Sequence, residues 1–212
     1  MHRVEFLWGI NLSTSSETTL SYAHTVTRSL VHRAAICEVL LTDVAQLSEQ
    51  EYVIAAQLPR VHSYYNDHIS SSTSYDPLLL VEAFRQTSIL VAHEFLGVPI
   101  DDKFVFNSGE LLVTDPSAPW IGGLPGRAEI VAVHAGLKHR ESVVIGSTLD
   151  MVLTVDGKEA ATMRTTTQWM PSSAWARLRE KGRAALELTP VRPHHTGRRI
   201  VPVHLGVVRG TA

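Results

Sequence analysis

The sequence has little cysteine, little net charge and no long hydrophobic run that is free of charged residues. Its single cysteine, Cys37, cannot form a disulfide within the chain, and its apolar neighbours predict a buried thiol in a reducing compartment. No cysteine spacing of the zinc-binding kind occurs, and no His-x-x-x-His pair is present. We therefore expect neither a disulfide framework nor a metal site, and no cofactor.

The charge balance argues against nucleic acid and membrane partners. The formal net charge is −2, and no basic patch dominates the sequence. The N-terminus carries Glu5 early and lacks a sustained apolar core, so it does not fit a signal peptide. The most apolar stretch, residues 77–96, contains Glu82 and Arg85, whose charges would be costly within a bilayer. These features predict a cytoplasmic protein.

That apolar stretch is nevertheless the element around which the chain is organised. Asp76 is a favourable N-cap and Pro77 suits the first helical position, while Gly97 followed by Pro99 supplies a terminating glycine and a breaker. The twenty residues between them make about 30 Å of helix. Because they are apolar on nearly every side, we expect a helix that other elements surround.

One side of this helix is polar. Glu82, Arg85, Gln86 and His93 lie at offsets 0, +3, +4 and +11, which aligns them along the helix. A polar stripe on a buried helix either pairs internally or faces a site, because an unpaired buried charge is expensive. A Glu82–Arg85 pair within the helix is the simpler interpretation, and His93 is expected to be a hydrogen-bonded core histidine.

The remaining patterns indicate strands on both sides of the helix. Asp156-Gly157 between two strand-like segments is the strongest hairpin signal in the chain. The expected strands are residues 31–43 and 52–58 before the helix, and 104–114, 128–137, 142–155 and 160–169 after it. This order predicts an α+β fold in which an antiparallel sheet curls around one long central helix.

The domain boundaries follow from the same patterns. Residues 1–29 are expected to be an exposed leader segment, and residues 30–188 a single domain that ends in a short helix from residue 172. Residues 189–212 form a tail with a strand-like piece at 200–208.

Four motifs carry a resemblance to known proteins: VHR at 31–33, EVLLTD at 38–43, QLPRVHSYY at 57–65 and LLVEAFRQ at 79–86. The last two resemble the region of hotdog dehydratases in which a histidine loop precedes a helix that bears a catalytic glutamate. All four resemble the A-factor biosynthesis hotdog family (AfsA-like), whose members make precursors of γ-butyrolactone autoregulators. The resemblance implies a hotdog fold. That family usually carries two hotdog repeats, so the tail looks like the opening of an incomplete second repeat.

The resemblance also implies a reaction. An acyltransferase of this family moves a β-ketoacyl group from an acyl carrier protein to the hydroxyl of dihydroxyacetone phosphate. Because hotdog sites form where two hotdog units meet, a homodimer is implied as well.

Candidate site residues can be fitted to this chemistry. His62 is the candidate base, and Glu82 either orients its imidazole or acts as the base itself. Arg85 can hold the phosphate of the acceptor or the developing oxyanion. The residues assigned to substrate binding are Arg60, Gln86 and Tyr64. Gln86 can also orient Glu82, and Tyr64 and Tyr65 can instead pack over the start of the helix.

Two other functions remain open at this point. The first is a hotdog acyl-thioester dehydratase or thioesterase that uses His62 and Glu82 as its acid–base pair. The second is a non-catalytic, truncated hotdog module that binds a partner.

Overall fold

The computed structural model describes residues 19–65 and 74–184. The chain divides into two compact units, Met1–Trp175 and Ala176–Ala212. The first contains the sheet and the long helix, and the second is described only over the end of helix α2 (Ser172–Ala184). The helix expected from residue 172 is therefore confirmed up to Ala184. The expected tail and its strand-like piece lie outside the described residues.

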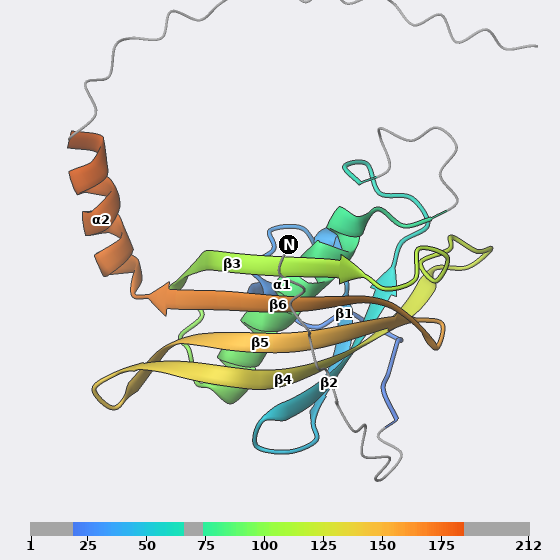
Figure 1. Cartoon of the computed structure of the whole chain (residues 1–212). Helices are drawn as coiled ribbons and strands as arrows, with labels where there is room; N and C mark the ends of the chain where they lie inside the picture. Colours follow the sequence, from blue (N-terminus) through green and yellow to red (C-terminus); the bar gives the residue numbers. More distant parts are fainter. Residues whose placement is uncertain (1–18, 66–73, 185–212) are drawn as a thin grey trace, which may run out of the picture. The chain divides into compact units, whose positions relative to one another are not determined.

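The first unit is a six-stranded antiparallel sheet that curls around helix α1 (Figure 1). The strands lie in the order β1-β2-β4-β5-β6-β3, and every neighbouring pair is antiparallel. Two strands precede α1 and four follow it, so the predicted α+β architecture is confirmed. The strand bounds are Leu41–Gln46 (β1), Glu51–Leu58 (β2), Lys103–Val113 (β3), Gly126–Arg140 (β4), Val143–Val155 (β5) and Lys158–Met170 (β6).

Helix α1 (Pro77–Phe95) begins and ends where the sequence predicts. The Asp76 side chain accepts a hydrogen bond from a backbone N–H of the first turn at 2.7 Å. At the other end Gly97 has a φ of 66°, the left-handed conformation that terminates many helices. No helix in the described part of the chain has the length and apolar character that a membrane span requires.

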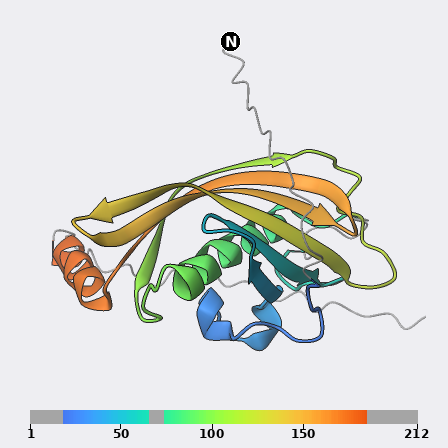
Figure 2. The ribbon, with the colours of Figure 1, turned by 90° about the horizontal axis from the view of Figure 1, so that it is seen from below.

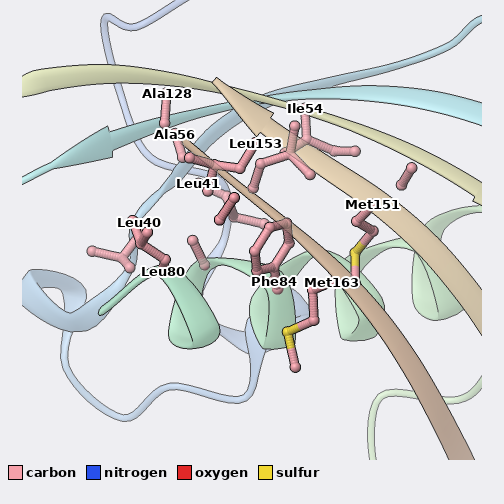
Figure 3. Packing of buried hydrophobic residues seen from close by; sticks show 14 of the residues in the cluster. Leu40, Leu41, Ile54, Ala56, Leu80, Phe84, Ala128, Met151, Leu153 and Met163 are labelled. Atoms are coloured by element: carbon pink, nitrogen blue, oxygen red, sulfur yellow. The ribbon is translucent and has the colours of Figure 1, made fainter. Parts of the chain in front are cut away.

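The apolar side of α1 packs into the concave face of the sheet. Phe84 projects from the helix towards Met151 and Leu153 of β5, and all three are fully buried (Figure 3). Leu80 and Ile54 belong to the same cluster and have no exposed surface. Each such large apolar side chain contributes about 1.5–3 kcal/mol on burial, so this contact fixes the helix within the sheet.

The hairpin between β5 and β6 is also as predicted. Asp156 and Gly157 have φ values of 47° and 80°. Positive φ at both central residues is typical of a type I′ turn, whose twist matches that of the flanking strands.

The strand expected over residues 31–43 is wrong. This segment forms two 3-10 turns, η1 (Arg28–Val31) and η2 (Ile36–Glu38), and β1 begins only at Leu41. Between the turns His32 adopts a left-handed conformation with φ 52°. The burial expected for Cys37 is wrong too, because η2 turns its side chain outward. The reason lies in the polar stripe of α1, which takes the hydrogen bonds that this segment would otherwise give to a sheet.

The described part of the expected leader lies along β1. Val26 N–H donates to Leu41 O at 3.0 Å, and Ser21 N–H donates to Asp43 Oδ2 at 2.8 Å. Residues 19–27 therefore cover part of one edge of the sheet, and residues 1–18 lie outside the described range. The opposite edge is β3, where no described residue adds a backbone hydrogen bond on the outer side.

Candidate active site

The segment 28–40 lies on the side of α1 that faces away from β4–β6 (Figure 2), and the polar stripe of α1 contacts this segment. Each of its four members contacts this segment. Arg85 Nη2 donates to Val31 O at 3.3 Å, and the three other contacts are made by Glu82, Gln86 and His93. The stripe therefore anchors a segment that is 46 to 61 residues away in the sequence.

Glu82 is the centre of an ionic cluster. Its Oε1 accepts from Arg33 Nη2 at 2.5 Å, from Arg33 Nε at 2.9 Å and from Arg85 Nη2 at 2.9 Å. Its Oε2 accepts from Arg85 Nε at 2.8 Å. The Glu82–Arg85 pair expected within the helix is confirmed. Arg33 was missed because nothing in the sequence links it to Glu82, although it ends the VHR motif.

In this cluster the carboxylate is buried and the two guanidinium groups are partly exposed. The Glu82 side chain is 8% exposed, whereas those of Arg33 and Arg85 are 27% and 30% exposed. Burial by itself would raise the pKa of the Glu82 carboxyl, but the hydrogen bonds from Arg85 and Arg33 outweigh it and lower that pKa. Glu82 is therefore a carboxylate near neutral pH, and its contacts leave it poorly suited to accept a proton.

Gln86 completes the cluster from inside the protein. Its Nε2 donates to Glu82 Oε1 at 2.6 Å and to Glu38 O at 2.8 Å, and its Oε1 accepts from Leu40 N at 2.9 Å. The expected contact that orients Glu82 is confirmed. Gln86 itself is completely buried, so the amide that we assigned to substrate binding does not reach solvent.

His62 lies in the loop after β2 and is not hydrogen bonded to Glu82. Its Nδ1 accepts from the backbone N–H groups of Tyr64 and Tyr65, at 3.2 Å and 3.4 Å. A neutral imidazole that accepts at Nδ1 carries its proton on Nε2. In this geometry His62 is arranged as a hydrogen-bond donor, and action as a base at Nε2 would require the other tautomer.

Tyr65 connects the His62 loop to the ionic cluster. Its ring lies 4.7 Å from that of His62 between centroids, and it packs against the core. Burial raises the pKa of the Tyr65 hydroxyl, and the nearby Glu82 charge raises it further. Tyr64 instead points outward and is 69% exposed, so the packing over the helix start that we expected is wrong for Tyr64. Arg60 is exposed, and its Nε donates to Gly122 O at 3.0 Å.

His93 is the hydrogen-bonded core histidine that the sequence predicts. Its Nδ1 lies 2.7 Å from Val98 O, and its Nε2 lies 2.9 Å from His32 Nε2. Burial lowers the pKa of His32, as does the neighbouring His93. His32 and Arg33 are consecutive residues, and they hold the two ends of the polar stripe.

Comparison with known proteins identifies the family. The model of the A-factor biosynthesis hotdog domain (AfsA) matches residues 14–171. A 2-oxo-3-(phosphooxy)propyl 3-oxoalkanoate synthase of Streptomyces virginiae is 33% identical over 138 residues, which are 65% of this chain and 46% of the relative. The protein of the same name from Streptomyces griseus is 25% identical over 179 residues, or 82% of this chain and 58% of the relative. The chain thus spans about half the length of these relatives.

Solved structures of low sequence identity also match. A hot-dog-like protein from Thermanaerovibrio acidaminovorans is 11% identical with a TM-score of 0.47, over 62% of this chain and 89% of that one. A hypothetical thioesterase from Streptococcus pneumoniae is 14% identical with a TM-score of 0.42, over 61% of this chain and 85% of that one.

The family match spans the sheet, α1 and the residues of the ionic cluster. The hotdog fold implied by the four sequence motifs is confirmed by this match and by the sheet wrapped around α1. The chain belongs to the A-factor biosynthesis hotdog family.

Proposed function

We propose that this protein transfers a β-ketoacyl group from the thioester of an acyl carrier protein to the hydroxyl of dihydroxyacetone phosphate. The product would be a phosphorylated 3-oxoalkanoate ester, as the names of the curated relatives describe. In this step the ester C–O bond forms, the thioester C–S bond breaks, and the hydroxyl proton ends on the released thiol. The observation that carries the proposal is the ionised Glu82 held between two partly exposed guanidinium groups.

The geometry supports separate roles for the charged groups. Arg85 offers a planar donor fork to an anionic oxygen, either on the acceptor or on the developing tetrahedral centre. His62, with its proton on Nε2, can donate to the thioester carbonyl oxygen as negative charge develops there. Glu82 contributes by fixing the guanidinium groups, because its own contacts stabilise the ionised form.

The protein would carry out this reaction as a homodimer, with Arg60 and Tyr64 exposed at the mouth of the site for the carrier-bound acyl chain. Both side chains are exposed near His62, which fits contact with a large partner.

The decisive experiment supplies β-ketoacyl carrier protein with and without dihydroxyacetone phosphate. We expect a phosphorylated ester only when the acceptor is present, and loss of that product in Glu82→Gln. Release of free acid or of a dehydrated thioester without acceptor would instead indicate a thioesterase or a dehydratase. No turnover of any kind would leave a partner-binding module and contradict the proposal.

The role of His62 can be tested in the same assay. Gln retains an N–H donor but cannot act as a base, so His62→Gln should keep much more activity than His62→Ala. Equal loss in both variants would contradict a role of His62 as hydrogen-bond donor.

A further inference from the structure

We propose that Arg33 and Arg85 together form a binding site for a phosphate ester, with Glu82 as the residue that positions them. This inference deepens the proposed function, because it assigns the anionic group of a substrate to two named side chains. Arg33 has no role in the sequence-based expectations, and its position beside Glu82 follows only from the fold.

The first observation is that both guanidinium groups meet at one atom. Arg33 Nη2 and Arg85 Nη2 lie 2.5 Å and 2.9 Å from Glu82 Oε1. Two cations so close would repel each other, and more strongly beside the buried Glu82 carboxylate than in bulk water. The carboxylate offsets this repulsion, and Gln86 in turn fixes the carboxylate at 2.6 Å.

The second observation is that donors remain. Arg33 directs Nε and Nη2 at Glu82, and Arg85 does the same. Neither Nη1 group makes a hydrogen bond within residues 19–65 and 74–184, and Arg33 Nη1 lies 3.9 Å from Glu38 Oε2. Because Glu38 is 44% exposed, it competes weakly for that group.

The third observation is charge. Two guanidinium groups exceed the buried Glu82 carboxylate by one positive charge, which Glu38, 3.9 Å from Arg33 Nη1 and 44% exposed, offsets only weakly, and 27% and 30% of the two arginine side chains reach solvent. A phosphate ester is the anion that this arrangement suits best, since planar guanidinium forks bind its oxygens in pairs. An uncharged sugar-like acceptor would gain little from it.

Two substrates of the proposed reaction carry such a group. One is dihydroxyacetone phosphate, a phosphate monoester, and the other is the phosphopantetheine arm of the carrier protein, a phosphodiester. Binding of each to the full chain can be measured by calorimetry, with dihydroxyacetone phosphate in one arm and holo-carrier protein in the other.

The test uses Arg33→Met and Arg33→Lys, because Lys keeps the charge but lacks the fork. We expect affinity for at least one of the two probes to fall about tenfold or more in Arg33→Met, as for the loss of a charged hydrogen bond, and to be recovered only in part by Lys. The control is Arg164→Met, which removes another bidentate arginine, paired with Asp150 on the opposite face of the sheet. It should leave both affinities unchanged.

The probe whose affinity falls identifies the substrate that supplies the phosphate. Unchanged affinity for both probes in folded Arg33→Met, as judged by circular dichroism, would overturn the site, even if acyl transfer takes place. Unchanged affinity in folded Arg33→Lys would overturn the paired contact of the guanidinium fork. Phosphate binding that depends on Arg33 in a protein without turnover would support the site while the proposed reaction fails. Where turnover is present, Arg33→Lys should raise KM for the probe that weakens and change kcat much less.

Discussion

Glu82 illustrates how the surroundings of a single residue decide its chemistry. A carboxyl buried to this extent would ordinarily have a raised pKa and could act as an acid or base. Here two arginines and an amide lower that pKa instead, so the group stays charged and serves as an anchor. Replacing it would release two cations whose geometry depends on it.

The buried His134 should make the free energy of unfolding decrease at acidic pH. Its side chain is 9% exposed, and within the described residues neither ring nitrogen has a hydrogen-bond partner. Burial lowers the pKa of His134, so the unfolded chain takes up a proton near pH 6.5, before the folded protein does. Stability is therefore full above about pH 6.5 and falls as the pH drops below it.

The variant His134→Phe checks this. It keeps an aromatic ring against the Tyr52 ring, whose centroid is 5.4 Å away, and removes the titrating group. Urea unfolding at pH 7.5 and pH 5.5 should show a smaller loss of stability in the variant than in the wild type. The variant should still lose some stability between pH 7.5 and pH 5.5, because burial also lowers the pKa of His32. The control His139→Gln changes an exposed histidine, and an identical pH slope in wild type and His134→Phe would contradict the prediction.

At the scale of elements, the end of α1 depends on one backbone conformation. Gly97 has φ 66°, and a Cβ added there would meet no atom within 4 Å. Gly97→Ala should therefore cost about 1–2 kcal/mol of unfolding free energy through backbone strain alone. Denaturant midpoints measure this cost. Gly122→Ala is the matched control, because Gly122 has equal space and no positive φ, and an equal effect at both positions would argue against strain as the cause.

The elements that the sequence predicts well are those determined by neighbouring residues. Asp76 and Gly97 act within one turn of the helix they delimit, and Asp156-Gly157 is itself the turn. Residues 31–43 have the composition of a strand, but their conformation is set by contacts with α1. Those contacts join residues 46 to 61 positions apart, which local propensity does not record.

The site shows the same division. Glu82, Arg85 and His93 share a helix, so their alignment follows from its period. Sequence spacing could not assign Arg33, His32 and Tyr65 to the same site. The first two lie in the segment 28–40 and the third in the loop after β2, and only the fold brings these segments to α1. The only sequence signal for Arg33 was its membership of a motif shared with the family.

At the scale of the whole molecule, the β3 edge is the surface that we propose for dimer formation. Residues 19–27 cover part of the β1 edge, whereas β3 carries no such cover among the described residues and exposes Phe106 and Leu112. An open edge of eleven residues favours pairing with another strand.

Light scattering tests this. We expect the purified protein to have twice the mass of the chain, and Leu112→Glu to shift it to the monomer, because a charge would replace an apolar side chain on the edge that pairs. Leu47→Glu places the same charge in the β1–β2 turn and should leave the dimer intact. A monomeric wild-type protein would rule out pairing through β3. So would a dimer that persists in Leu112→Glu but dissociates to the monomer in Leu47→Glu.

The Leu40 N–H donates a hydrogen bond to the buried amide of Gln86, so hydrogen exchange of this proton reports the opening of the segment 28–40. It can exchange with deuterated water only when the segment 28–40 lifts from α1 or when the whole domain opens. If its exchange matches that of the central strands, segment and core melt as one cooperative body. Faster exchange would mean that the segment detaches first and carries Arg33 away from Glu82 while the sheet stays packed on α1.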